Sequence, residues 1–456
     1  MKKALLWIVV LVLSISMVAA FSFAGCKKET APAKEEVVAG EEAAETTTAK
    51  QEEPVKLTYL SLAWLKGEQD VTKQVIDEWN KQHPEIQVEY VQGDWGTIAE
   101  YLLTSFETGD VPDMFQYQAI SITDWKDRGV LVDMTPMLDT GMKDDVLPGF
   151  WQMLTTKDNR IIGLPFEFET DSLFYNKAIF AEKGIQVPDL NSPWSLDELI
   201  EVAQKLTDPT QGKYGVALAG MGLSIEVIND TWATKIGFSP VTKEGDNMVV
   251  KVNNPKYLDL MKKIHDMIYV QKVTPADVVG IQYDATPGFL EGKYAIVAGW
   301  GCWMRALITE SAKGKNIDWG LLPPIKIDTA STYGQLQTIS ICEKSAHKNE
   351  AMEFLKYFWN TENQIKIAKS AYLFPGRLSA VNSKEFSTSE EGWDMAQSAA
   401  KNLVVPLHVI TPGWGAFFNG IGATIYQEYF SDQITLEQFV EKCEREGTKA
   451  LKEEIQ

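Results

Sequence analysis

A regular alternation of strand and helix patterns constrains the fold of this chain more than any other feature of its sequence. It begins at residues 55–63, a β-branched and apolar run of the kind that forms a strand covered on both faces. A helix, a strand, a second helix and a third strand follow over residues 68–83, 83–92, 95–108 and 109–118. We therefore expect an α/β fold with a mostly parallel sheet between layers of helices.

The same pattern returns later in the chain. In the segment 194–207, Ser195 followed three positions later by Glu198 predicts a capped amphipathic helix. Within the earlier helix, the residues expected on the apolar face are Ile98, Leu102, Leu103 and Phe106. The chain has 456 residues, more than one hydrophobic core usually organises, so two domains are expected.

The N-terminus carries an export pattern. Lys2 and Lys3 precede an uncharged apolar stretch that ends near Ala20, and the sequence FAGC follows over Phe23–Cys26. This layout is typical of a bacterial secretory signal peptide, and FAGC resembles the site at which lipoproteins are cleaved and lipidated. Two other interpretations stay open, namely cleavage after Ala20 and retention of the apolar stretch as a membrane anchor.

We expect residues 1–25 to be removed as a lipoprotein signal peptide and Cys26 to be lipidated. Residues 26–54 are acidic, low in complexity and without aromatic side chains, so they form a disordered tether. The formal net charge of −20 disfavours nucleic acid as a partner. The protein is thus expected to be anchored on the outer face of the cytoplasmic membrane, or to be periplasmic.

The remaining cysteines, Cys302, Cys342 and Cys443, show no metal-binding spacing. A disulfide between Cys302 and Cys342 is one interpretation, and three buried free thiols is the one we favour. Catalytic motifs are missing, and the four histidines stand far apart in the sequence, at His83, His265, His347 and His408. We expect no enzyme activity, no cofactor and no metal site.

Four blocks, in this order, resemble the extracellular solute-binding proteins of bacterial ABC importers, the group that includes the maltose-binding protein. They are DEWNKQHPEIQVEYV with SFETGDVPDMF, GLPFEFETDSLFYNKAIFAEKGI with PWSLDEL, FLEGKYAIVAGWGCW, and HKNEAMEFLKYF. The resemblance covers the chain from Val55 onward. It implies a two-lobe periplasmic-binding-protein fold (type II), with discontinuous α/β lobes that are joined by hinge strands and close on a ligand.

By the same resemblance, the first crossing between lobes lies near Pro165–Thr170. The implied N-terminal lobe comprises residues 55–166 with 323–368, and the C-terminal lobe comprises 167–322 with 369–456. The implied function is that of a monomeric solute-binding subunit, which captures a mono- or oligosaccharide in the cleft and delivers it to the permease of an ABC importer.

A sugar site needs aromatic platforms for the apolar ring face and short polar groups for the hydroxyls. Acids alternate with other residues at Glu167, Glu169 and Asp171, and the period of a strand places the three carboxylates on one face. The resemblance implies that Glu169 accepts sugar hydroxyls and that Trp303 stacks on the sugar. The other candidates are Trp64, Glu68, Asp70, Gln116, Tyr117, Asp230, Trp232, Trp300, Arg377 and Trp414. Tyr333 and Gln335 are further candidates.

Two alternatives stay open. The carboxylates and tryptophans could instead bind a cation such as a polyamine or an amino sugar, through charge and cation–π contact. A secreted glycoside hydrolase would need a carboxylate on each side of the scissile bond. The acids that the sequence places share one strand, which disfavours the hydrolase.

Overall fold

The structure is a computed structural model that describes residues 53–219, 222–280, 283–312 and 317–453. Cys26 lies outside the described residues, as do the expected signal peptide and nearly all of the expected tether. Among the described residues, no helix combines the length and the apolar character that crossing a membrane would require.

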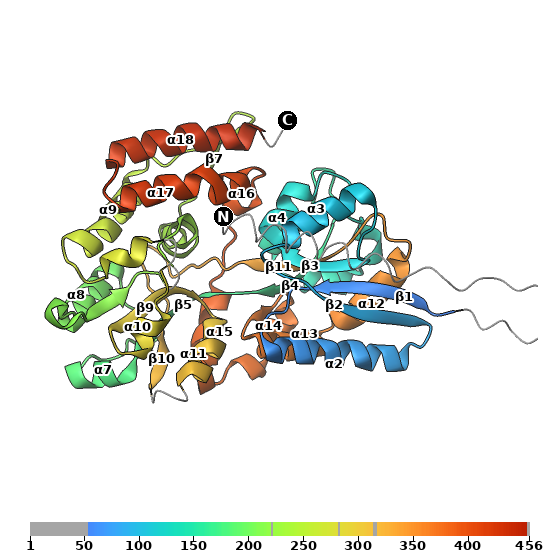
Figure 1. The fold of residues 1–456 in the computed structure, drawn as a ribbon, viewed down its shortest axis with the longest axis horizontal. Coiled ribbons are helices and arrows are strands. Elements are labelled where there is room, and N and C mark those ends of the chain that lie inside the picture. Colours follow the sequence, from blue (N-terminus) through green and yellow to red (C-terminus); the bar gives the residue numbers. More distant parts are fainter. Residues whose placement is uncertain (1–52, 220–221, 281–282, 313–316, 454–456) are drawn as a thin grey trace, which may run out of the picture. The chain divides into compact units, whose positions relative to one another are not determined.

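A six-stranded sheet organises the first part of the chain, in the strand order β12-β4-β11-β3-β1-β2 (Figure 1). Its strands are β1 (Val55–Ser61), β2 (Ile86–Gln92), β3 (Met114–Gln118), β4 (Leu164–Phe168), β11 (Leu336–Ile341) and β12 (Phe374–Pro375). Strand β1 runs parallel to β2 and β3, whereas β11 is antiparallel to β3 and β4, and β12 is antiparallel to β4.

The expectation of a mostly parallel sheet was therefore wrong. The parallel neighbours in this sheet are β1 with β2 and β1 with β3, and these three strands are connected through the local crossover helices α2 and α3. Strands β11 and β12 belong to segments far from β1 in the sequence. The residues near β1 therefore do not predict the direction in which β11 and β12 run.

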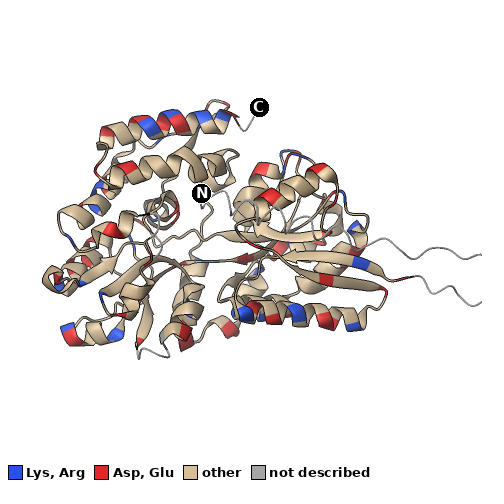
Figure 2. Ribbon diagram, viewed as in Figure 1, with Lys and Arg blue, Asp and Glu red and all other residues tan. Residues whose placement is uncertain are grey.

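Helices cover both faces of this sheet, with α3 and α4 on one side and α2 and α13 on the other (Figure 1). The helices of this region are α2 (Lys66–Gln82), α3 (Ile98–Thr108), α4 (Ala119–Trp125), α5 (Thr140–Asp144), α6 (Pro148–Leu154), α12 (Lys348–Phe358) and α13 (Thr361–Ala371). Charges of both signs follow the outer face of α2 (Figure 2). In α3 the expected apolar face is confirmed except at Leu103, which is 43% exposed, because the core reaches only Ile98, Leu102 and Phe106.

A second, four-stranded sheet has the order β10-β5-β9-β6. Its strands are β5 (Asp171–Asn176), β6 (Tyr214–Ala217), β9 (Tyr294–Gly301) and β10 (Trp319–Leu322), and only β6 and β9 are parallel. Its helices are α7 (Lys177–Lys183), α8 (Leu196–Leu206), α9 (Pro255–Tyr269), α10 (Thr286–Leu290) and α11 (Met304–Ala312). The capping box of α8 is confirmed, since Ser195 and Glu198 exchange side chain-to-backbone hydrogen bonds.

The late segments add helices and a hairpin. They are the β7 (Val241–Glu244) and β8 (Asn247–Val250) hairpin, then α14 (Leu378–Val381), α15 (Trp393–Lys401), α16 (Trp414–Phe417), α17 (Ala423–Phe430) and α18 (Leu436–Glu453). Helix α18 packs on β8 through its buried face, where Gly447 leaves room for Val250. Cys302, Cys342 and Cys443 are buried and unpaired, which confirms the favoured interpretation of the thiols.

The chain passes from the first sheet to the second over two residues. Strand β4 ends at Phe168 and β5 begins at Asp171, so Glu169 and Thr170 form the link. The chain returns between β10 and β11, over residues 323–335. The lobe limits implied by the resemblance stay a prediction, although β12 on the first sheet lies beyond the expected limit at residue 368.

Candidate functional site

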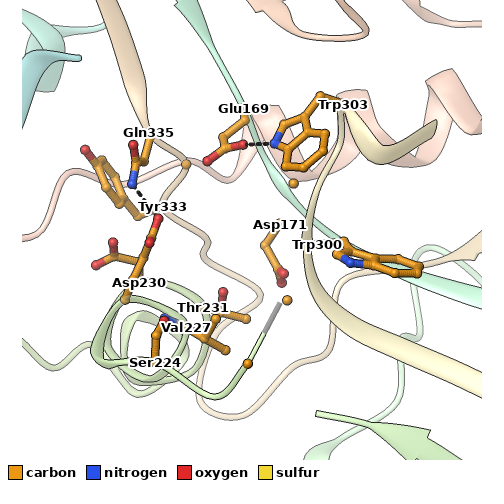
Figure 3. A pocket seen from close by; sticks show the side chains of 15 residues that line it. Glu169, Asp171, Ser224, Val227, Asp230, Thr231, Trp300, Trp303, Tyr333 and Gln335 are labelled. Carbon is orange, nitrogen blue, oxygen red and sulfur yellow. Dashed lines mark hydrogen bonds between the residues drawn. The ribbon is translucent and has the colours of Figure 1, made fainter. Parts of the chain in front are cut away.

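A cavity lies beside the link between the two sheets. Its walls come from the link itself, the end of β9, the helical segment around a π-helical turn (Val227–Trp232), and residues 333–335. Carboxyl groups and aromatic rings dominate the wall (Figure 3). The side chains on which the chemistry depends are Glu169, Asp171, Glu226, Asp230, Trp303 and Gln335.

Glu169 and Trp303 are joined directly. The indole Nε1–H of Trp303 donates a hydrogen bond of 2.6 Å to Oε2 of Glu169 (Figure 3). Burial raises the pKa of Glu169 to about 7, and the bond from Trp303 opposes that rise. Gly301 makes the contact possible, because a Cβ there would lie 2.2 Å from Oε2 of Glu169 and 2.4 Å from Nε1 of Trp303.

Asp171 faces a buried lysine. Its Oδ2 lies 3.7 Å from Nζ of Lys235, and Lys235 also donates to the backbone carbonyl of Ser331 at 3.3 Å. Burial raises the pKa of Asp171, and the ammonium opposes this. The other oxygen, Oδ1, has no hydrogen-bond partner. The backbone of Gly299 and the side chain of Thr231 also lower the pKa of this carboxyl group.

Two further acids come from the helical segment. Glu226 accepts a hydrogen bond from Nε2 of Gln335. Burial raises the pKa of Glu226 to about 8, and the charges of Asp230 and Glu169 add to the rise. Asp230 lies 2.8 Å from Nε2 of His408. The sequence reasoning missed Glu226, although its position four residues before Asp230 in a helical segment indicates a shared face.

A second opening adjoins the first and shares Glu169, Trp303 and Gln335 with it. Trp64 and Trp95 line this opening and are 41% and 38% exposed. The ring of Trp64 meets Trp303 edge to face, with centroids 5.0 Å apart. Exposed aromatic faces at a concave surface suit the apolar face of a sugar ring. Trp95 was not among the predicted residues.

The three acids expected on one face do not stay together. Glu169 and Asp171 line the cavity, but Glu167 does not. Glu167 lies in β4, is fully buried, and has no hydrogen-bond partner for either oxygen. The expectation was wrong because the alternation of a strand requires a continuous strand, and the chain changes sheet at Glu169 and Thr170.

Several predicted tryptophans are packed into the interior. Trp232 and Trp414 are 1% and 2% exposed and do not line the cavity. Trp300 lines the cavity with part of its surface, but its ring turns away from the carboxylates and packs edge to face on Phe174 (Figure 3).

The remaining candidates lie behind or beside the wall. Gln116 donates to Oε1 of Gln337, a residue of the second opening, at 3.0 Å, and Tyr117 stacks on Trp125. Glu68 is buried, accepts from the backbone amide of Trp64, and has a pKa that burial raises to about 7. Two others form ion pairs elsewhere, namely Asp70 with Lys66 and Arg377 with Asp145. None of these lines either opening.

The arrangement offers many hydrogen-bond acceptors in a half-open cavity and aromatic faces at a second, somewhat more open one. Within the described ranges, no group of three His, Cys, Asp or Glu side chains is placed to hold a metal ion.

Comparison with known sequences gives one family and several relatives. The family described as bacterial extracellular solute-binding protein matches residues 65–365. An uncharacterized lipoprotein in the oleD 5′ region of Streptomyces antibioticus is 27% identical over 395 residues, which is 84% of each chain. A maltotriose-binding protein of Pyrococcus abyssi is 24% identical over 370 residues, 79% of this chain and 74% of that protein.

Solved structures share the fold. The ABC substrate-binding protein Lmo0181 from Listeria monocytogenes, in complex with cycloalternan, has a TM-score of 0.72 and 17% identity, covering 88% of this chain and 99% of that one. A cyclo/maltodextrin-binding protein with maltotetraose has a TM-score of 0.71 and 21% identity, covering 90% and 99%. The fold is thus the two-lobe α/β fold of periplasmic binding proteins.

Proposed function

Because the chain belongs to the bacterial extracellular solute-binding protein family, we propose that it captures a carbohydrate outside the cytoplasm and delivers it to an ABC permease. The observation that carries this proposal is the pairing of Glu169 with Trp303 at the wall of the cavity, with Trp64 beside them. A carboxylate that accepts sugar hydroxyls next to an aromatic face is the chemistry that a saccharide requires.

The relatives support this class of ligand. The protein of Pyrococcus abyssi is named as maltotriose-binding, and two of the solved structures hold cycloalternan and maltotetraose. The second opening, with Trp64 and Trp95, extends the site beyond one sugar ring, which favours an oligosaccharide. We propose that the ligand bridges the two sheets and that the lobes, with the limits given above, close on it as a monomer.

Thermal unfolding tests the proposal. A ligand that binds only the folded protein raises its unfolding temperature, so glucose, maltose, maltotriose, cellobiose and spermidine can be screened directly. We expect at least one saccharide to raise it and to remain chemically unchanged after incubation. A rise with spermidine alone would contradict sugar binding, and release of hydrolysis products would show that the protein is an enzyme.

We also propose that Cys26 carries a lipid that holds the protein at the membrane. The sequence FAGC supports this, as does the relative from Streptomyces antibioticus that is named a lipoprotein. Cys26→Ala should move the protein from the membrane fraction to the soluble fraction, while Thr30→Ala, a matched change in the same segment, should not. A Cys26→Ala protein that stays with the membrane would indicate that the apolar stretch itself is the anchor.

A further inference from the structure

The wall of the cavity beside the link is rich in acidic side chains. Glu169, Asp171, Glu226 and Asp230 all line it. Among the described residues of its wall, none is Lys, Arg or His. The nearest positive charge is Lys235, which lies behind Asp171 and is 0% exposed. A ligand in this cavity therefore meets four carboxyl groups and, among the described residues of the wall, no basic side chain.

Two of the side-chain amide or indole donors on this wall are already engaged by the acids. The indole of Trp303 donates to Glu169, and the amide of Gln335 donates to Glu226. His408 lies against Asp230, where its other ring nitrogen contacts Ser239. The carboxyl oxygens thus add several acceptors to a wall whose hydroxyl groups are those of Ser224, Thr231 and Tyr333. A sugar hydroxyl both donates and accepts, whereas an ammonium group only donates, in three directions.

Among the described residues of the cavity wall, one buried carboxyl oxygen is left without a partner. Oδ1 of Asp171 is buried without a hydrogen-bond partner, and the residue is 8% exposed. Figure 3 shows the Asp171 carboxylate directed into the space between Glu169 and the π-helical turn. A buried acceptor without a partner is costly, so an arriving donor regains that free energy. This makes Asp171 the point at which a charged donor would be held.

We propose that this cavity binds a protonated amino group, and that the carbohydrate captured by the protein is an amino sugar. The inference rests on the proposed function, because it assumes that the ligand is a saccharide. The ammonium would lie between Asp171 and the acids of the helical segment, Glu226 and Asp230. The sugar ring would then extend toward Trp303 and Trp64 in the second opening.

A bare metal ion does not fit the same acids, since the described residues contain no group of three placed to hold one. A linear polyamine would satisfy the charge but would leave the exposed rings of Trp64 and Trp95 without a flat partner. The tryptophans and the acids together fit a ligand that carries both a ring and an amine.

Titration of the acids supplies a second readout. The titratable groups that line the cavity are the four acids and Tyr333, and Lys235 and His408 lie behind them. The pKa of Glu169 is about 7 and that of Glu226 about 8, both raised by burial. An ammonium stabilises their ionised forms, so binding it releases protons to the buffer, whereas a neutral sugar releases none.

Three disaccharides of the same linkage test the proposal. They are cellobiose, deacetylated chitobiose and N-acetylated chitobiose, of which only the second carries amines. Titration calorimetry below about pH 7, where an amine of ordinary pKa is protonated, should show deacetylated chitobiose binding at least about tenfold more tightly. Raising the salt concentration should weaken that binding, and two buffers of different ionisation enthalpy should report proton release.

Two variants localise the effect. Asp171→Asn and Glu226→Gln should each reduce the affinity for deacetylated chitobiose by about tenfold or more and narrow its advantage over cellobiose. Glu226→Gln is included because Asp171→Asn leaves Lys235 without its partner and can unfold the protein. Asp77→Asn, on the exposed face of α2, is the matched control and should bind like the original protein.

The outcomes separate the two proposals. Equal affinity for cellobiose and deacetylated chitobiose would overturn the amino-sugar proposal while leaving carbohydrate binding intact. Failure of deacetylated chitobiose to bind would overturn it as well. Binding of spermidine with no saccharide bound would overturn carbohydrate binding itself, and the amino-sugar proposal with it.

Discussion

The indole N–H of Trp303 donates a hydrogen bond of 2.6 Å to the carboxyl group of Glu169. One residue follows the end of β9 and the other links β4 to β5, so the bond ties the aromatic wall of the site to the passage between the two sheets. Any change in this bond should therefore alter ligand binding before it alters the fold.

Trp303→Phe keeps an aromatic ring but removes the donor. We expect the affinity for the bound saccharide to fall by about tenfold or more, because a hydrogen bond to a charged group contributes ~1.5–3 kcal/mol. Titration calorimetry measures this. The control is Trp151→Phe, which removes an indole donor whose 2.9 Å bond to the carbonyl of Lys143 lies outside the site. Equal losses in both variants would contradict the assignment.

Gly301→Ala should disturb the same bond by a different route. The added Cβ would lie 2.2 Å from Oε2 of Glu169 and 2.4 Å from Nε1 of Trp303, so one side chain must move. We expect ligand affinity to be lost, with a modest decrease in unfolding temperature, since the clash is with side-chain ends. Gly67→Ala in α2, whose Cβ would meet only an ordinary contact at 3.5 Å, should leave affinity unchanged.

Lys235→Met should destabilise the folded protein strongly. The ammonium is buried and lies 3.7 Å from Asp171, and removing it leaves a buried carboxylate without its counter-charge. Breaking a buried ion pair in this way lowers the free energy of unfolding by ~3–5 kcal/mol, and urea unfolding would measure the loss.

Two further variants check that reasoning. The double change Lys235→Met with Asp171→Asn should recover part of the loss, because the stranded charge is removed too. Lys262→Met, which breaks an exposed pair with Asp266 in α9, should cost less than about 1 kcal/mol. A double variant no more stable than Lys235→Met alone would refute the role given to the ion pair.

The raised pKa of Glu226 predicts a pH dependence of stability. The carboxyl holds its proton up to about pH 8 in the folded protein, against a usual value of 4.5. The folded state thus binds more protons than the unfolded state between these values, so stability falls as pH rises through that window and stays low above it.

Glu226→Gln removes this penalty. We expect the ligand-free variant to melt higher than the original protein above the raised pKa, and at nearly the same temperature below pH 4.5. Glu201→Gln, on the exposed face of α8, is the control and should not change the pH profile. Parallel melting curves for Glu226→Gln and the original protein across the range would show that Glu226 does not titrate in this way.

Local pattern was enough to place many elements. The strand at β1, the helix at α2 and the capping box of α8 depend on residues within a few positions of one another, so the sequence alone predicts them. The pairing of distant strands does not depend on residues that are close in the sequence, so local pattern does not predict it. Strand β11 lies antiparallel between β3 and β4. Its pairing with β3 joins segments that are more than two hundred residues apart in the sequence.

In the candidate site, too, the sequence predicts some of the residues and misses others. The order of the blocks and the residue types at Glu169 and Trp303 indicate a binding cleft in the sequence itself. The sequence reasoning missed Glu226 and Lys235, because their role depends on the acids that lie near them in the folded chain. Trp95 was missed for a similar reason, since only the folded chain brings it beside Trp64 in the second opening.

By itself, the sequence determined the class of fold, the alternation of its first elements, and the kinds of side chain available for a ligand. Tertiary structure decided which of those side chains meet. Glu167, Glu169 and Asp171 look equivalent as an alternating run, yet the change of sheet after Phe168 buries the first and turns the other two into the cavity. Burial and proximity are properties of the folded chain, and they decide which carboxyl groups can reach a ligand.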